Sequence, residues 1–385
     1  MSDGNQNQYT SDKMKEKFPI YSLATLCNTT IGIGIFALPY IASRVGIWVM
    51  AAYFLVLGTV AVAVHLMFAE VSLATPDYKR FPGFAKVHLG AWGERIALVC
   101  TIVGFLASMI AFMVIGGQFL QSFLSPWVNA PDSVFSVVYF LAGSILIYFG
   151  INLVSKIELW GLIAFFLILG AITIVGLPFF QLSNLSANSG NPKDFFLPYG
   201  AVLFALWASS SIPEVEEMLG REKRKKFLKP VIFWSSAISL FAYSVFTVMI
   251  LGLTGQATTE SALMGLRALF GGNLLALCFL FGFITSFTSF IIIGLTLKKI
   301  LAYDLKLDKR VAWVVTVLTP LTLYLAGIKD FIAIFSFVGG ILLSIDGIMI
   351  VLMYEKIWPD RKFIAYPLLI FFIGGIIYEL AYSFR

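Results

Sequence analysis

Two long apolar segments of this chain are each interrupted near their middle by residues that weaken an α-helix. Residues 20–43 contain Gly32 and Gly34, and residues 197–218 contain a run of three serines followed by Pro213. Glycine raises the free energy of a helix interior, and proline removes a backbone donor. A helix that unwinds at such a point leaves backbone amides and carbonyls unpaired. Amides at the start of a half-helix favour a carboxylate, and carbonyls at the end of one favour an ammonium group or a small cation.

An amino acid carries both charged groups, so two such breaks predict a site for one. We expect the substrate carboxylate to contact mainly the backbone of the first break, at Thr30, Ile31, Gly32, Ile33 and Gly34. We expect the substrate amino group to contact the second break, around Phe204, Trp207, Ser209 and Ser210. Aromatic side chains beside the breaks are candidates for closing over the substrate, namely Phe36, Phe204 and Trp207.

Hydroxyl side chains in the eighth apolar segment indicate where a coupling ion could bind. Thr285, Thr288 and Ser289 have the i, i+3, i+4 spacing that places them on one face of a helix. Such hydroxyls either bond the carbonyl four residues back or, with carbonyls near Asn28 and Ile31, form a sodium site. The residues leave both interpretations open.

Ionisable side chains within apolar segments are functional candidates, because a charge is costly to bury in a membrane. Any of them could carry a coupling proton in place of sodium. The candidates for this role are Glu158, Glu214 and Asp346, and His65 is a further ionisable residue in such a segment.

The elements that must position these residues are membrane-spanning helices. Of 385 residues, 59% are hydrophobic and only 12% are charged, which is too little charge to cover a soluble domain of this size. Repeated apolar runs of about 20 residues are typical of helices that cross a bilayer. The sequence predicts eleven such helices, near 20–43, 46–74, 94–124, 133–151, 157–180, 197–218, 229–253, 273–303, 311–326, 331–354 and 362–383.

The net charge of +6 reflects membrane topology rather than nucleic-acid binding. With the N-terminus inside, most of the 27 lysines and arginines fall on the inner side, as the positive-inside rule requires. This arrangement predicts a disordered cytoplasmic segment at 1–19 and a C-terminus outside the cell. The sequence contains no long hydrophilic segment and no histidine- or serine-centred hydrolase motif, so we expect no enzymatic activity.

The two breaks lie five spans apart, and this spacing predicts an internal repeat. The long spans at 94–124 and 273–303 each follow a short amphipathic stretch, which supports the same pairing. Because five spans are an odd number, the second half must have the opposite orientation in the membrane. We therefore expect a first five-helix repeat at 20–180, a second, inverted repeat at 197–354 and an extra helix at 362–383.

Four motifs resemble those of a known family. They are Asn28–Pro39 (NTTIGIGIFALP), Ala69–Pro76 (AEVSLATP), Ser211–Leu219 (SIPEVEEML) and Ser344–Gly347 (SIDG). Together they resemble the amino acid/auxin permease family of the amino acid–polyamine–organocation superfamily. The resemblance implies an all-α membrane protein of the LeuT-like fold, with a five-plus-five inverted repeat and with helices 1 and 6 broken. It also implies amino-acid transport by alternating access, driven by Na⁺ or H⁺.

The resemblance also bears on the coupling ion. Asn28 and Thr288 match an asparagine and a hydroxyl residue that sodium-coupled relatives have in helices 1 and 8. Residues 163–170 lack the lysine that sodium-independent relatives often have midway along helix 5. The chain departs from the family at the second break, where residues 208–211 read ASSS instead of a glycine closely followed by an acidic residue.

These features predict a multi-pass protein of a prokaryotic plasma membrane that transports small neutral amino acids together with Na⁺ or H⁺. Alternatives are an amino-acid exchanger and a sensor or channel-like protein without coupled net transport. The expected partners are the amino acid, the coupling cation and the lipid bilayer. We expect no nucleic acid and no cofactor beyond a sodium ion.

Overall fold

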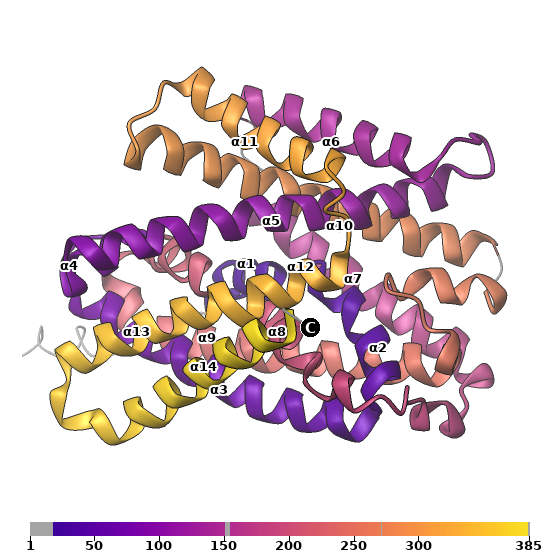
Figure 1. Cartoon of the computed structure of the whole chain (residues 1–385), viewed down its shortest axis with the longest axis horizontal. Helices are drawn as coiled ribbons and strands as arrows, with labels where there is room; N and C mark the ends of the chain where they lie inside the picture. The colour runs from indigo at the N-terminus through magenta and orange to yellow at the C-terminus, as the bar shows by residue number, and fades with distance from the viewer. Residues whose placement is uncertain (1–17, 151–154, 271, 384–385) are drawn as a thin grey trace, which may run out of the picture.

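The structure is a computed structural model that describes residues 18–150, 155–270 and 272–383, and every regular element in these ranges is a helix (Figure 1). The predicted disordered segment at 1–19 lies almost wholly outside the described residues. The α-helices are α1 (Ile20–Thr30), α2 (Gly34–Val45), α3 (Ile47–Ala74), α4 (Phe81–Leu89), α5 (Ala91–Leu124), α6 (Asp132–Phe149), α7 (Ser155–Gly176), α8 (Pro198–Leu206), α9 (Ile212–Thr254), α10 (Gly272–Lys299), α11 (Lys309–Leu325), α12 (Phe331–Phe337), α13 (Ser344–Ile357) and α14 (Lys362–Ser383).

Short 3₁₀ and π-helical turns connect or interrupt these helices. The 3₁₀ turns are η1 (Leu177–Phe179), η2 (Leu182–Ser186), η3 (Pro192–Phe196), η4 (Ser209–Ser211), η5 (Gly255–Ala257), η6 (Leu263–Ala268) and η9 (Pro359–Arg361). The π-helical turns are η7 (Ile300–Asp304) and η8 (Val338–Leu343). Because η8 joins α12 to α13, these three elements form one interrupted span.

The described helices account for the predicted membrane spans. Eight are long and apolar enough to cross a bilayer, and the bent pair α1–α2 makes a ninth crossing. One of the eight is the 66-residue stretch Pro192–Ala257, which is interrupted at the second break and again at Gly220 (φ 70°, ψ 171°). About 20 residues suffice for one crossing, so this stretch holds the sixth and seventh predicted spans. The ninth predicted span is α11, with 17 residues, and each of the eleven predicted segments therefore has a helical counterpart.

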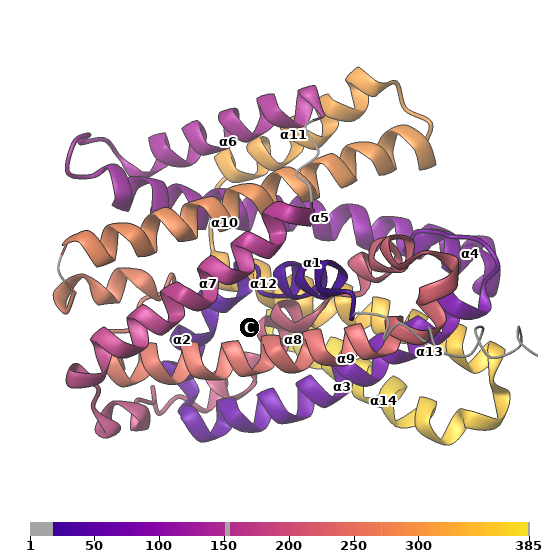
Figure 2. The same ribbon diagram turned by 180° about the vertical axis from the view of Figure 1, so that it is seen from behind.

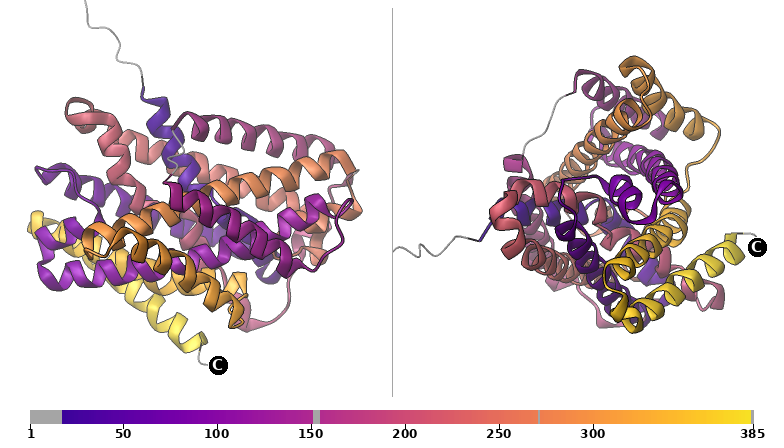
Figure 3. Two further views of the ribbon diagram at one scale, coloured as in Figure 1. Left: turned by 90° about the horizontal axis from the view of Figure 1, so that it is seen from above. Right: turned by 90° about the vertical axis from the view of Figure 1, so that its left-hand side faces the viewer.

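The helices form two groups that lie side by side (Figures 1 and 2). One group contains α5, α6, α10 and α11, and the other contains α1, α2, α3, α8 and α9. The span built from α12, η8 and α13 packs between them and is mostly buried, whereas α14 lies at the rim (Figure 3). Phe363 and Ile370 of α14 are 84% and 71% exposed, as expected for side chains that face lipid.

A close backbone contact fixes α8 against the central span. A Cβ atom added to Gly339 of η8 would lie 1.8 Å from the carbonyl oxygen of Gly200 in α8. Only glycine allows this approach, because any side chain would push the two elements apart. The first half of the broken sixth helix is thereby held in place beside the first break.

Candidate functional site

The first break separates α1 from α2 and bends the chain by 47°. The amide of Ile31 donates to the carbonyl of Cys27 at 2.7 Å, and the amide of Gly32 turns back to the carbonyl of Thr30 at 2.8 Å. The regular hydrogen-bond ladder stops there and begins again at Gly34. The glycines predicted to interrupt the first span therefore lie at the break itself.

The second break follows α8, which ends at Leu206. Trp207 has an extended backbone (φ −83°, ψ 121°) and Ala208 is also non-helical (φ −129°, ψ 12°), before η4 and α9 resume the helix. The two breaks lie against one another: a Cβ atom added to Gly34 would come within 2.9 Å of the Cα atom of Ala205. Segments about 170 residues apart in the chain are thus packed backbone to backbone.

One side chain joins both breaks. The hydroxyl of Tyr243 in α9 bonds the carbonyl of Thr30, and it lies 2.8 Å from the carbonyl oxygen of Ala205. Tyr243 is fully buried, so neither carbonyl can turn to water instead. Tyr243 is not among the residues predicted from the sequence, although a tyrosine in the middle of an apolar span is a signal for such a contact.

A cavity of about 210 Å³ lies at the two breaks. From the predicted carboxylate set, Thr30, Gly32, Ile33 and Gly34 line it, whereas Ile31 is buried elsewhere. The predicted residues of the second break that line it are Phe204, Trp207, Ser209 and Ser210. The structure therefore brings most of the predicted substrate residues, 170 or more positions apart in the sequence, around one space.

The walls of this cavity are rich in aromatic and aliphatic side chains. Phe105 and Phe112 of α5 and Ile292 of α10 face it beside the residues of the breaks. The ring of Phe204 stacks on Phe335 of α12 at 4.0 Å between centroids. Such a cavity can enclose a flat, apolar side chain between its walls, with backbone groups at the breaks for a polar end.

The predicted cation residues are only partly assembled. Asn28 and Ser289 both line the cavity, from α1 and α10, whereas Thr285 and Thr288 lie outside its lining. The Thr288 hydroxyl donates to the carbonyl of Thr285 at 3.0 Å. The hydroxyl is thus bonded to its own helix backbone, but three residues earlier and not four.

Two of the predicted proton carriers reach the cavity. Glu214 lines it and pairs with Arg80, with 2.5 Å between Oε1 and the arginine Nη1. Asp346 of α13 lines it too and is only 8% exposed, and its Oδ1 has no hydrogen-bond partner among the residues that the structure describes. The side chain of Glu158 lies outside the described residues.

The lining of the cavity extends to Arg80, Phe81 and Pro82 at the start of α4, and α4 lies at one end of the molecule (Figure 1). Its lining there includes the exposed Arg80 and the half-exposed Glu214. Phe36, predicted as a gate residue, lies on the opposite side of the breaks and outside the lining. Its ring packs edge-on against Phe119 and Phe246, with centroids 4.8 and 6.0 Å away.

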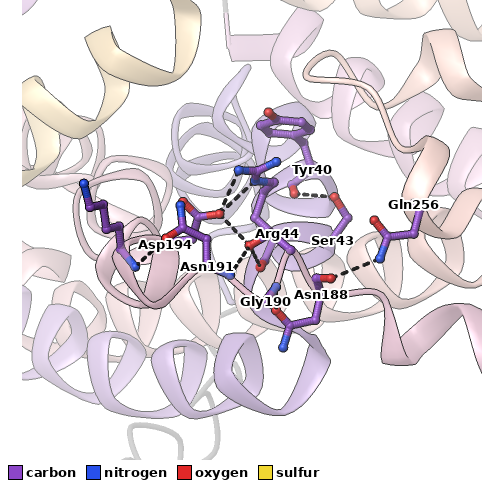
Figure 4. Close-up of polar contacts among 10 residues, drawn as sticks. Tyr40, Ser43, Arg44, Asn188, Gly190, Asn191, Asp194 and Gln256 are labelled. Atoms are coloured by element: carbon purple, nitrogen blue, oxygen red, sulfur yellow. Dashed lines mark hydrogen bonds and ion pairs between the residues drawn. The ribbon is translucent and has the colours of Figure 1, made fainter.

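A polar cluster lies at the end of α2, beyond the first break (Figure 4). The guanidinium of Arg44, at the end of α2, donates to Asp194 Oδ2 at 2.9 Å, and the Ser189 hydroxyl donates to the same oxygen at 2.7 Å. The Ser189 amide also donates to the carbonyl of Arg44 at 3.0 Å. The cluster ties the end of α2 to the loop that leads into α8, so the two half-helices are held together at this end.

Comparison with known proteins gives the same architecture and one family. The profile of the tryptophan/tyrosine permease family matches residues 15–363. The tyrosine-specific transport system 1 of Haemophilus influenzae is 25% identical over 364 residues, which cover 89% of this chain and 88% of that protein. MhsT in complex with L-phenylalanine superimposes with a TM-score of 0.69 at 10% identity and covers 93% of this chain and 98% of its own. Mhp1, a nucleobase-cation-symport-1 family transporter with bound bromovinylhydantoin, superimposes with a TM-score of 0.64 at 14% identity. The match covers 94% of this chain and 90% of Mhp1.

Proposed function

We propose that this chain, which belongs to the tryptophan/tyrosine permease family, carries an aromatic amino acid across a bacterial membrane by alternating access. The chain is a multi-pass permease and not an enzyme. The family profile narrows the resemblance to amino acid/auxin permeases that the motifs indicated. The observation that carries the proposal is the cavity at the two breaks, with backbone groups at one part and aromatic walls at another.

The cavity supports an aromatic rather than a small substrate. Phe105, Phe112 and Phe204 provide flat apolar contact area, and aromatic rings pack well edge-on or offset against one another. The relative from Haemophilus influenzae is named for tyrosine transport, which favours the same substrate class. We therefore replace the expectation of a small neutral amino acid with tyrosine or tryptophan.

The polar end of the substrate would occupy the breaks. Ile33 and Gly34 precede and begin α2, where the amides of the first helical turn and the positive end of the helix dipole favour the carboxylate. The carbonyls at the end of α8 favour the ammonium group. Tyr243 already bonds the carbonyl of Ala205, and the amide of Trp207 bonds the carbonyl of Phe204, so the carbonyl of Trp207 is the best placed for the amino group.

For the coupling ion we propose a proton carried by Asp346. Its carboxyl group is buried, faces the same cavity as the substrate residues and leaves one oxygen unpaired among the described residues. Glu214 is less suited because Arg80 already binds it. Sodium is the second candidate, favoured by the presence of Asn28 and Ser289 in the same lining. The back-bonded Thr288 hydroxyl gives it less support.

Uptake into proteoliposomes tests both parts of the proposal. Labelled tyrosine, tryptophan, phenylalanine and alanine would be offered with a pH gradient or a sodium gradient imposed separately. We expect concentrative uptake of tyrosine or tryptophan driven by the pH gradient. Uptake of alanine alone would refute the aromatic substrate, and uptake driven only by sodium would refute the role of Asp346. Counterflow without net uptake would identify an exchanger, and binding without counterflow would identify a sensor.

A further inference from the structure

A buried histidine lies directly behind the second break, on the side away from the cavity. His65 of α3 is 1% exposed and is one of only two histidines in the sequence. Its Nε2 accepts a hydrogen bond from the backbone amide of Ala208 at 3.2 Å. The two residues are 143 positions apart in the chain, so this contact crosses between the second and sixth spans.

The break itself creates the need for this acceptor. In a continuous helix the amide of Ala208 would bond the carbonyl of Phe204, four residues earlier. The extended backbone of Trp207 prevents this, and the amide of Trp207 takes the Phe204 carbonyl instead, at 3.4 Å. A buried amide without a partner is costly in a membrane interior, where no water replaces the lost bond. His65 supplies the missing acceptor.

The contact defines the chemical form of the imidazole. A neutral ring accepts a hydrogen bond only at the nitrogen that carries no proton, so the proton of His65 is on Nδ1. A protonated ring would present a donor to the donor of Ala208. Hydrocarbon side chains of similar size, such as leucine, offer no acceptor at all.

The same ring also supports the side chain of Trp207. Its centroid lies 5.3 Å from the Trp207 ring at an interplanar angle of 65°, and Phe372 of α14 contacts that indole from another direction at 6.0 Å and 87°. Trp207 lines the substrate cavity, whereas His65 does not. One side chain outside the cavity therefore contacts both residues that form the second break.

We propose that His65 is a positioning residue for substrate binding, which holds the Ala208 amide and the Trp207 ring of the second break in their binding geometry. This role rests on the proposed function, because the affected wall belongs to the proposed substrate site. His65 touches no substrate. It acts through the backbone turn that presents the carbonyl of Trp207 and through the indole that forms part of the cavity wall.

Three substitutions separate the acceptor from the volume of the ring. In His65→Gln the amide oxygen reaches about as far from the backbone as Nε2 does, whereas in His65→Asn it is one bond shorter, and His65→Leu has no acceptor. We expect KM for the transported aromatic amino acid to rise about tenfold in His65→Leu and His65→Asn, the size of effect that loss of one buried hydrogen bond gives. We expect Vmax per transporter in the membrane to change less than twofold and KM of His65→Gln to stay within about threefold of wild type. The matched control is His88→Leu, which removes the second histidine of the chain, located on α4.

Hydrogen exchange of the reconstituted protein tests the contact without reference to transport. The amide of Ala208 should be protected in wild type and in His65→Gln, and it should exchange at least tenfold faster in His65→Asn and His65→Leu. Unchanged KM together with unchanged exchange in His65→Leu would overturn the inference, and so would a His65→Gln variant as defective as His65→Leu. If His65→Leu does not reach the membrane, the Gln and Asn pair gives the same comparison. If wild type takes up no aromatic amino acid, the proposed function fails, while the exchange measurement still decides whether His65 holds the break.

Discussion

Removal of the Tyr243 hydroxyl should weaken substrate binding by separating the two breaks. The hydroxyl contacts the carbonyls of Thr30 and Ala205, and all three groups are buried. One phenolic proton serves both carbonyls, so Tyr243→Phe removes the equivalent of one shared hydrogen bond. The Thr30 carbonyl keeps the amide of Gly32 as a donor, whereas the Ala205 carbonyl loses the Tyr243 donor. The ring itself stays in place, which limits the change to this contact.

The magnitude follows from the cost of an unsatisfied buried acceptor, about 1–3 kcal/mol. At 1.4 kcal/mol for each factor of ten, this corresponds to about 5- to 100-fold in an equilibrium constant. The proposed site needs both breaks in their present relative position to bind the substrate. Most of the lost binding free energy should therefore appear as a higher KM. We expect KM to rise about tenfold with Vmax within about twofold of wild type.

The assay is initial-rate uptake in proteoliposomes that contain equal amounts of transporter. Tyr148→Phe is the matched control, because Tyr148 on α6 is 49% exposed and far from the breaks in the fold. An unchanged KM and an unchanged unfolding temperature for Tyr243→Phe would refute the reasoning. A fall in Vmax alone, with KM unchanged, would mean that the hydroxyl acts in the conformational change and not in binding.

Three further outcomes are expected. Gly34→Ala would force Cβ to within 2.9 Å of the Cα atom of Ala205. Overpacking of this kind costs about 1–3 kcal/mol, so uptake should fall about 5- to 100-fold. Gly170→Ala is the control, because Gly170 faces open space and the variant should transport normally. Asp346→Asn should abolish uptake driven by a pH gradient while counterflow of labelled substrate continues, and unchanged gradient-driven uptake would exclude Asp346 as the proton carrier. Arg44→Gln should lower the unfolding temperature, with a loss of about 1–2 kcal/mol from the half-exposed ion pair, and adding Asp194→Asn should restore part of it. If the losses in Arg44→Gln and Asp194→Asn simply add in the double variant, the pair is not coupled.

The sequence was sufficient to predict the features that depend on local composition. Gly32 and Gly34 weaken the first span at the point where α1 ends and α2 begins, and the serine run before Pro213 does so in the sixth span. Apolar length alone indicated the helices, because each span must satisfy its own backbone in lipid. The extra helix predicted at 362–383 has the same bounds as α14.

The contacts that hold the breaks depend on the tertiary fold and could not be predicted this way. Tyr243 meets its partners 213 and 38 positions away, and His65 meets Ala208 at a distance of 143 positions. No periodicity within a helix indicates which neighbouring helix such a side chain will face. The position of Phe36 has the same origin: it follows the first break closely in sequence, but the course of α2 carries it toward Phe119 and away from the cavity.

The arrangement of contacts indicates which would change during the proposed alternating access and which would persist. The ring of Phe36 belongs to α2 and packs against Phe119 of α5, so this contact joins the two groups of helices. It must separate if the cavity is to open at that end. The Arg44–Asp194 pair instead joins α2 to η3, and the Tyr243 hydroxyl joins α9 to the ends of α1 and α8. These polar contacts can survive the motion, so the two breaks can move as one unit with the substrate between them.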